Sequence, residues 1–260
     1  MAGAGAAGRL DMCGIGCCLC GSAEAAQARA SQVERCLAAR GPDFQATKSA
    51  LASRLQLVGA VLHMRGQQLC QQPVCDDDGN VLLWNGEIFG GLPVGEAQSD
   101  TAMLSAELRA CGTKAAVLQL IERVHGPFAF IYWQASTSTL FFGRDRFGRR
   151  SLLINRPDRE RIENEFLLCS AAPETSECEW REVDLGGVYT LTGFEGLSAG
   201  DAAASRTIGG LHDVVEFHEV RRPPLLCPNR STLTPPGLHF CSGRRMSSDS
   251  PHTSLRAASS

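Results

Sequence analysis

The residue best suited to nucleophilic chemistry is Cys13, in the segment Met12-Cys13-Gly14-Ile15 near the N-terminus. A thiol can attack an amide carbonyl, but a lone cysteine among apolar residues is more often a small buried hydrophobe. Six short motifs follow it in order: Arg40-Gly41-Pro42-Asp43, His63-Met64-Arg65, Trp84-Asn85-Gly86-Glu87-Ile88-Phe89, Ser99-Asp100, Gly126-Pro127-Phe128-Ala129-Phe130 and Phe142-Gly143-Arg144-Asp145-Arg146-Phe147-Gly148. The ordered set, rather than the cysteine alone, indicates a functional site.

With these motifs in this order, the sequence resembles the class II glutamine amidotransferases, in particular their asparagine synthetase branch. The spellings at residues 83–89 and 142–153 carry the resemblance most clearly, and it covers roughly residues 12–192. It implies an α+β, N-terminal-nucleophile fold, a four-layer α/β/β/α sandwich of two antiparallel sheets with helices on both outer faces. It also implies hydrolysis of L-glutamine to L-glutamate and ammonia through a cysteine thioester, linked to asparagine biosynthesis and glutamine metabolism.

The resemblance assigns a role to each candidate residue. Cys13 matches the family's nucleophile, and the family's base is the α-amine of that cysteine, acting through water. An amine with a pKa of about 7.7–8.0 is partly unprotonated at pH 7 and can accept the proton. Asn85 and the Gly86 N–H match the oxyanion hole. The substrate-binding residues implied are Arg65 for the α-carboxylate, Asp100 for the ammonium group, and Glu87 in the same pocket.

Two departures from the family bear on activity. The family's cysteine is the first residue of the mature chain, whereas residues 1–11 and Met12 precede it here. An acylated Cys13 nitrogen cannot act as a base, so the family's mechanism requires a form that begins at Cys13. The synthetase partner's Ser-Gly-Gly-x-Asp-Ser pyrophosphate loop is also missing, because Cys241-Ser242-Gly243-Arg244-Arg245 lacks the second glycine. We therefore expect no ATP site, no other cofactor and no metal.

Alternative interpretations stay open for several of these residues. Asn85-Gly86 alone would suit a type I′ hairpin turn, and Asp100 alone would suit a helix N-cap. We expect Arg144-Asp145 and the pair Arg149-Arg150 to form a solvated turn or a structural ion pair outside the active site. For the whole chain, the alternatives to a glutaminase are a catalytically inactive glutamine-binding or protein-interaction module and a self-processing hydrolase of the same fold.

Composition excludes several classes of function. The 260 residues carry a formal net charge of −3, which gives no electrostatic case for a nucleic-acid or anionic-membrane partner. No apolar run approaches the roughly 18 residues that span a bilayer, and residues 1–11 lack a secretory signal. We expect a cytoplasmic protein whose 12 cysteines are reduced. The groups Cys17-Cys18-Leu19-Cys20 and Cys70 to Cys75 then suit buried strands better than a zinc site.

Hydrophobic periodicity predicts the elements that position these motifs. We expect helices after Ser22 as far as Arg40, over 100–110 and over 113–124. We expect strands over 12–20, 55–62, 81–84, 128–133, 140–143, 151–154, 166–170 and 182–191. Runs of strands around helices, without strict alternation, indicate α+β with antiparallel sheets.

The sequence divides into three parts. We expect residues 1–11 to be an N-terminal extension and residues 12–195 to be the glutamine amidotransferase domain that the resemblance implies. Residues 196–260 are rich in serine and proline, with six of the 12 prolines beyond Arg222. We expect this tail to be largely disordered and to add nothing to the folded core, because such a composition buries little apolar surface.

Overall fold

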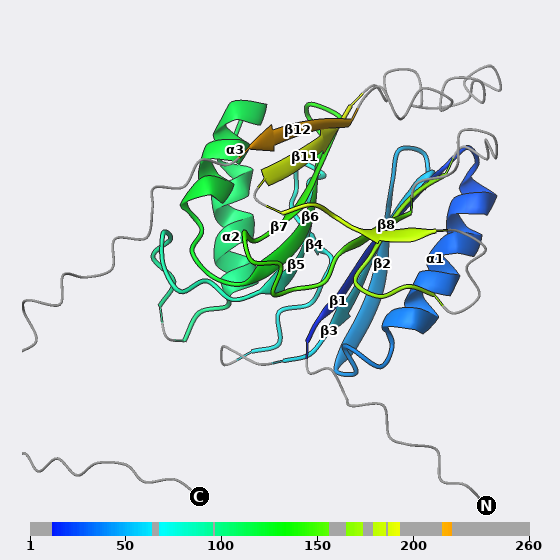
Figure 1. Cartoon of the computed structure of the whole chain (residues 1–260), viewed down its shortest axis with the longest axis horizontal. Coiled ribbons are helices and arrows are strands. Elements are labelled where there is room, and N and C mark those ends of the chain that lie inside the picture. The colour runs from blue at the N-terminus through cyan, green and yellow to red at the C-terminus, as the bar shows by residue number, and fades with distance from the viewer. Residues whose placement is uncertain are drawn as a thin grey trace, which may run out of the picture. The chain divides into compact units, whose positions relative to one another are not determined.

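The computed structural model describes residues 12–63, 68–95, 97–155, 165–173, 179–185, 187–192 and 215–219. The chain divides into two compact units, residues 1–222 and residues 223–260, and the second lies wholly outside the described residues. Every helix and strand given below belongs to the first unit (Figure 1).

One antiparallel sheet contains the strand that follows Cys13. Its six strands lie in the order β10 (Trp180–Glu182), β8 (Leu153–Asn155), β9 (Glu165–Cys169), β1 (Gly14–Cys20), β3 (Leu55–Val61) and β2 (Phe44–Ala50). β1 is central and pairs antiparallel with β3 and β9, with Gly14 opposite Ala60 and Gly16 opposite Cys169.

The second antiparallel sheet contains the Asn85-Gly86 motif. Its six strands lie in the order β12 (Val215–Glu219), β11 (Gly187–Leu191), β7 (Thr139–Arg144), β6 (Phe128–Gln134), β5 (Val81–Gly86) and β4 (Val74–Cys75). β5 pairs along its whole length with β6, so that Asn85 lies opposite Ala129 and Gly86 opposite Phe128. The hairpin-turn interpretation of Asn85-Gly86 is therefore wrong, because both residues belong to a paired strand.

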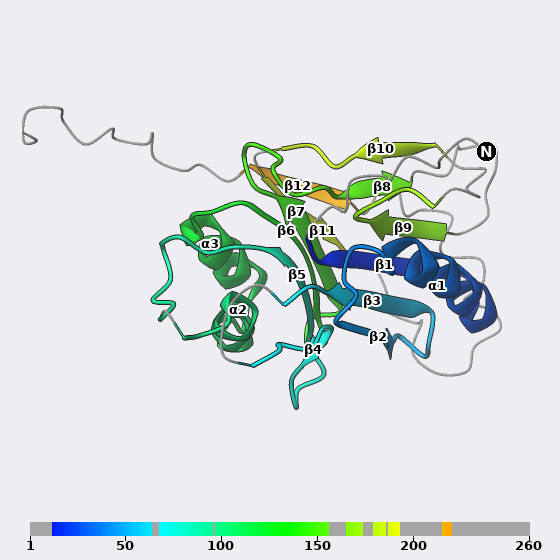
Figure 2. The same cartoon turned by 90° about the horizontal axis from the view of Figure 1, so that it is seen from below.

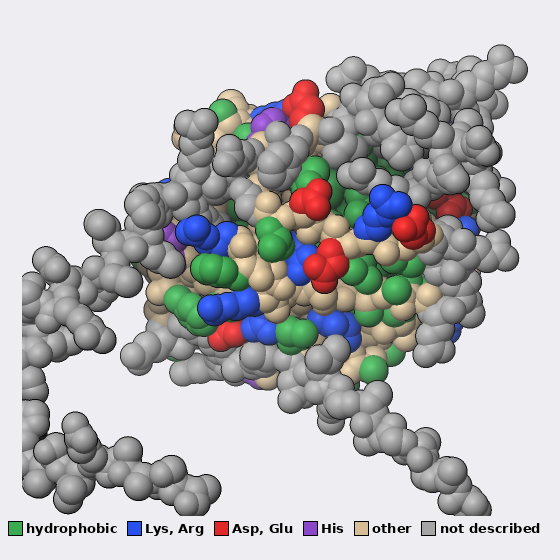
Figure 3. Space-filling view, viewed as in Figure 1, with side chains coloured by type: hydrophobic (Ala, Val, Ile, Leu, Met, Phe, Trp, Pro, Cys, Tyr) green, Lys and Arg blue, Asp and Glu red, His purple; other side chains and the backbone are tan. Residues whose placement is uncertain are grey.

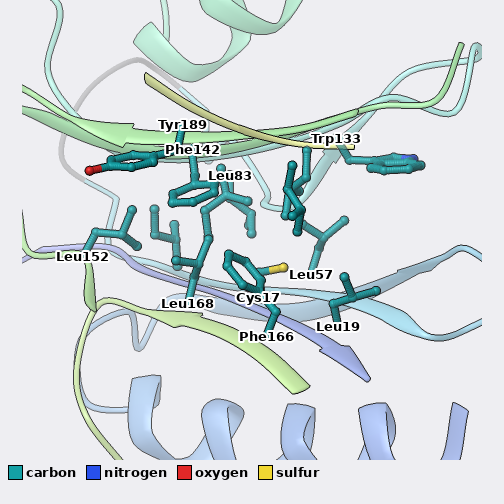
Figure 4. Close-up of a cluster of buried hydrophobic side chains, with 14 of the residues drawn as sticks. Cys17, Leu19, Leu57, Leu83, Trp133, Phe142, Leu152, Phe166, Leu168 and Tyr189 are labelled. Carbon is teal, nitrogen blue, oxygen red and sulfur yellow. The ribbon is translucent and has the colours of Figure 1, made fainter. Parts of the chain in front are cut away.

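The main hydrophobic core fills the space between the two sheets. Alternate residues of each strand point into it, as a side-chain period of two requires. Figure 4 shows side chains from β1, β3 and β9 meeting those from β5, β6, β7 and β11, including Cys17, Leu57, Leu83, Phe142, Phe166 and Tyr189. Phe142 stacks on Tyr189 with ring centroids 5.2 Å apart.

Helix α1 (Ala23–Leu37) covers the outer face of the first sheet. Ser22 is its N-cap, with Oγ accepting from the Ala25 N–H at 3.2 Å, and its buried face consists of Ala26, Ala30, Val33 and Leu37. The residues of β1 that face this helix are all small, namely Gly14, Gly16, Cys18 and Cys20. A Cβ on Gly16 would lie 2.4 Å from Val33 Cγ1. Small residues on this face therefore permit the close approach of α1.

Helices α2 (Asp100–Arg109) and α3 (Lys114–Arg123) cover the outer face of the second sheet (Figure 2). Trp84, Phe128 and Phe130 form the aromatic part of this smaller core, and Trp84 stacks on Phe128 at 5.1 Å. The predicted four-layer α/β/β/α sandwich with two antiparallel sheets is thus confirmed.

Some elements differ from the sequence-based expectation. Strands β2 and β4 were not expected, and the strand expected over 182–191 is two strands, β10 and β11. Part of the expected disordered tail is also ordered, because residues 215–219 form β12 against β11, and Lys114 of α3 forms an ion pair with Glu216. For these five residues the expectation of disorder is wrong. The domain boundary at residue 195 stays a prediction, and residues 1–11 lie outside the described part.

We predict that Gly16→Ala destabilises the domain by about 1–3 kcal/mol through overpacking. The added methyl would meet a β-branched side chain that has little rotamer freedom in a helix. Gly112→Ala is the matched control, since a Cβ there meets nothing within 4 Å. Urea denaturation would measure both, and Val33→Ala in the Gly16→Ala background should recover part of the loss. Equal effects at Gly16 and Gly112 would contradict this packing.

Candidate active site

Cys13 lies directly ahead of β1, where the central strand of the first sheet begins. Its thiol donates to the Leu62 carbonyl at 3.5 Å and accepts from the Leu62 N–H at 3.4 Å. Burial raises the pKa of the Cys13 thiol, whereas the Leu62 contact and the charges of Arg150 and Arg40 oppose this rise. The sulfur is therefore anchored to the end of β3 in a basic environment.

The Arg40-Gly41-Pro42-Asp43 motif forms the turn that follows α1. Arg40 Nε donates to the Cys13 carbonyl at 3.4 Å, and the Asp43 carboxylate accepts from the His63 N–H at 2.7 Å. A Cβ on Gly41 would lie 2.1 Å from the backbone of β3, so only glycine fits there. The motif thus braces the backbone on both sides of the thiol.

Asn85 and Gly86 end strand β5. Asn85 is 2% exposed, and its Nδ2 has no hydrogen-bond partner among the described residues. A buried amide donor without an acceptor is uncommon in folded proteins. A Cβ on Gly86 would lie 2.6 Å from the Pro127 carbonyl oxygen, so the strand end packs tightly against the chain leading into β6.

Gln72 holds this strand end where β4 no longer pairs with it. Its side-chain amide accepts from the Trp84 N–H at 2.6 Å and donates to the Trp84 carbonyl at 2.9 Å. One buried side chain therefore replaces the backbone pairing that an adjacent strand would supply. Sequence reasoning missed Gln72, because a single glutamine in a loop carries no signal of such a role.

Asp100 is the first residue of α2 and is 6% exposed. Its Oδ2 accepts from the Ile88 N–H at 3.0 Å. The N-cap interpretation of Asp100 is wrong, because Ser99 is the N-cap and its hydroxyl accepts from the Ala102 N–H. Asp100 instead ties the start of α2 to the chain that follows Gly86.

Glu87 and Arg150 form an ion pair, with Arg150 Nη2 2.6 Å from Glu87 Oε1. Arg144 and Asp145 are structural, as expected, and they hold the loop that leads to Arg150. Arg144 donates to the carbonyls of Gly148 and Arg150, while Asp145 accepts from three backbone N–H groups. The expectation that Arg150 lies outside the site is wrong, because this loop turns its side chain towards Cys13.

The site contains one cavity of about 170 Å³. It brings together five of the six predicted site residues, Cys13, Asn85, Gly86, Glu87 and Asp100, with Gln72, Trp84, His63, Cys70 and Arg150. The sixth, Arg65, lies outside the described residues. Cys17, Cys18 and Cys20 are buried in β1, and burial raises the pKa of each thiol, that of Cys20 to about 12. They are packing residues, as expected.

The described residues contain no group of three or more His, Cys, Asp or Glu side chains arranged to hold a metal. Within the same residues, no helix is long and apolar enough to cross a membrane. The face shown in Figure 3 carries acidic and basic side chains interspersed with apolar ones.

Comparison with known proteins agrees with this architecture. The family model described as a glutamine amidotransferase domain matches residues 12–174, and the chain belongs to this family. A solved structure described as the allosteric regulatory enzyme of purine biosynthesis superposes with a TM-score of 0.50 at 12% identity. The superposition covers 80% of this chain and 49% of that one, and the likeness is one of fold.

Curated relatives that are similar to this chain carry an asparagine synthetase domain in their names. Asparagine synthetase domain-containing protein 1 from Bos taurus is 40% identical over 185 residues, which cover 69% of this chain and 28% of the relative. The protein of the same name from Mus musculus is 36% identical over 234 residues, covering 87% of this chain and 35% of the relative. The chain thus spans about a third of the length of these relatives.

We predict that Gln72→Leu lowers the free energy of unfolding by about 1–3 kcal/mol, because it leaves buried polar groups of Trp84 without partners. Gln71→Leu is the matched control, since the neighbouring Gln71 is exposed. Chemical denaturation of both variants measures the difference. If the two variants unfold alike, the amide of Gln72 does not brace β5.

Proposed function

We propose that this chain hydrolyses L-glutamine to L-glutamate and ammonia through a γ-glutamyl thioester on Cys13. The observation that supports this most directly is the buried Asn85 amide, which has no acceptor among the described residues and lines the cavity that contains the thiol. A donor kept free in this way is suited to an oxygen that becomes negative during the reaction.

The proposed reaction begins with transfer of the Cys13 thiol proton, through a water molecule, to the α-amine of Cys13. The sulfur then attacks the side-chain amide carbon of glutamine, a C–S bond forms, and the carbonyl oxygen becomes an oxyanion facing Asn85 Nδ2 and the Gly86 N–H. Collapse breaks the C–N bond, and the departing nitrogen takes the proton from the α-ammonium and leaves as ammonia. Water attacks the thioester carbon and gives a proton to the α-amine. The C–S bond then breaks, the sulfur regains that proton, and glutamate departs.

Recognition of the amino-acid end of glutamine would fall to other residues. The carboxylate of Asp100 is buried and would pair with the substrate ammonium group. The Arg65 guanidinium would bind the α-carboxylate, which its planar fork suits. Glu87, paired with Arg150, would form the wall between the two ends.

The reaction as proposed requires a free α-amine, because an amide nitrogen has no basic lone pair. We therefore assign the activity to the form of the protein that begins at Cys13. The names of the relatives suggest that the released ammonia serves asparagine biosynthesis. The proposed glutaminase step uses only side chains, the α-amine, the Gly86 N–H and water.

We predict that a chain beginning at Cys13 hydrolyses glutamine and reacts with diazo-oxo-norleucine at Cys13, with protection by excess glutamine. The same chain preceded by residues 1–12 should release no ammonia, because its Cys13 nitrogen is acylated. Ammonia release and peptide mass spectrometry provide the two measurements, and Cys13→Ser is the blank. Glutamine binding without turnover in the chain that begins at Cys13 would instead establish the non-catalytic module.

We predict that Asn85→Ala lowers kcat by about 10²–10³ with a smaller change in KM, because its donor matters most once the oxyanion forms. Asp100→Ala should act the other way and raise KM first, because its carboxylate binds the ground-state ammonium group. Steady-state kinetics separate the two effects, and thermal denaturation controls for folding. An Asn85→Ala variant with unchanged kcat would exclude the amide from the oxyanion hole.

A further inference from the structure

The adjacent residues Arg149 and Arg150 lie in different environments. The Arg149 guanidinium stacks over the Phe147 ring at 5.4 Å, and the Phe147 side chain is exposed. Arg150 instead lines the cavity beside Cys13, and its side chain is 14% exposed. The charge of Arg149 therefore lies at the surface, whereas the charge of the neighbouring Arg150 lies in the cavity.

The position of Arg150 is fixed through both its backbone and its side chain. Arg144 Nε donates to the Arg150 carbonyl at 3.0 Å, and Arg150 Nη2 binds Glu87 at 2.6 Å. Its Nε is buried and has no hydrogen-bond partner within the described part of the chain. Glu87 thus holds the Arg150 guanidinium in place, and the buried Nε–H is left without an acceptor among the described residues.

The loop that carries Arg150 is connected to the strand that carries Cys13. Ser151 Oγ donates to the Ser170 carbonyl at 2.7 Å, and Ser170 Oγ accepts from the Ile15 N–H at 3.1 Å. Ser170 N–H also donates to the Ile15 carbonyl at 2.9 Å. The residue after Arg150 is therefore joined through Ser170 to a residue two positions after Cys13.

Several other charged or titratable groups surround the thiol: Arg40 at the turn after α1, His63 after β3, Cys70, Glu87 after β5 and Asp100 on α2. Glu87 partly neutralises Arg150, but its side chain is 35% exposed. Water screens the more exposed carboxylate more effectively than the buried guanidinium. Arg150 is therefore the less screened member of this ion pair, and its positive charge acts on the sulfur.

We propose that Arg150 stabilises the thiolate form of Cys13 and is a further functional residue of this site. The proposal rests on the proposed glutaminase function for its biological purpose, although its chemistry can be tested without glutamine. Arg150 takes no proton from the thiol. It lowers the free energy of the state in which the Cys13 sulfur is negative and the proton resides on the α-amine.

The electrostatics of the thiol agree with this arrangement. Burial raises the pKa of Cys13, and Arg150 is the stronger of the two guanidinium charges that oppose this rise. In a cavity that penalises a negative sulfur, one fixed cation offsets part of the penalty at the moment the nucleophile forms.

The test measures alkylation of Cys13 by iodoacetamide against pH in chains that begin at Cys13, with the exposed Cys75 as the internal reference. Arg150→Met should slow the reaction of Cys13 at pH 7 by about tenfold and move the midpoint of its pH profile upward by about one pH unit. Arg150→Lys keeps the charge and should retain most of the reactivity. Arg149→Met removes the same charge from the neighbouring position and should leave the profile unchanged.

Each outcome bears on one of the two proposals. An unchanged Cys13 profile in Arg150→Met, or equal losses in the Met and Lys variants, would overturn the role of the Arg150 charge even if glutamine is hydrolysed. A selective loss in Arg150→Met, in a chain that hydrolyses no glutamine, would support Arg150 and overturn the glutaminase proposal. If Arg150→Met does not fold, Arg150→Lys is compared with the unaltered chain. A Lys variant whose Cys13 reacts more slowly, with its pH midpoint moved upward, contradicts the proposal.

Discussion

Strand β1 is covered on one face by the opposing sheet and on the other by α1, and this double burial dictates which residues it can carry. The residues facing the other sheet are Ile15, Cys17 and Leu19, whereas those facing the helix are Gly14, Gly16, Cys18 and Cys20. Larger residues on the helix side would push α1 away and open the core. The same alternation directs Cys13, one step before the strand, towards the space between the sheets, where Asn85 lies one residue before the end of β5. The packing of one strand therefore also determines where a thiol and an amide donor can meet.

Three buried side chains around the cavity form hydrogen bonds to the neighbouring backbone and hold it in place. Gln72 pairs with Trp84, Asp145 collects three N–H groups, and Arg144 binds the carbonyls of the loop before Arg150. Breaking such a bond leaves a buried polar group without a partner. This lowers the stability of the fold more than breaking a solvent-exposed hydrogen bond would. Loops that would otherwise be mobile at the end of the sandwich are therefore fixed. This explains why the Phe-Gly-Arg-Asp-Arg-Phe-Gly motif is structural although it lies next to the site.

Much of this could be predicted from sequence, because strong periodicity and capping residues have local causes. Helix α1 and the strands flanking the core follow from such patterns. The family resemblance implied the layer order and indicated five of the residues that line the cavity. The failures have tertiary causes. Strand β2 contains residues such as Lys48 and Ser49 that are exposed, so it lacks an apolar signal. Strand β12 exists only as a partner of β11, and Arg150 differs from Arg149 only through the path of a loop that Arg144 and Asp145 impose.

A buried thiol and an efficient nucleophile make opposite demands, and the cavity has to satisfy both. Desolvation makes the sulfur reactive once it is ionised, yet it also disfavours ionisation and raises the pKa of Cys13. The proposed base, the α-amine of Cys13, belongs to the residue that carries the thiol and needs no second side chain. Fixed cations offset part of this rise, because Arg40 and Arg150 lie on separate elements and both charges lower the pKa of Cys13. The proposed requirement for a free N-terminus and the basic surroundings of Cys13 would then both follow from placing the nucleophile at the start of β1.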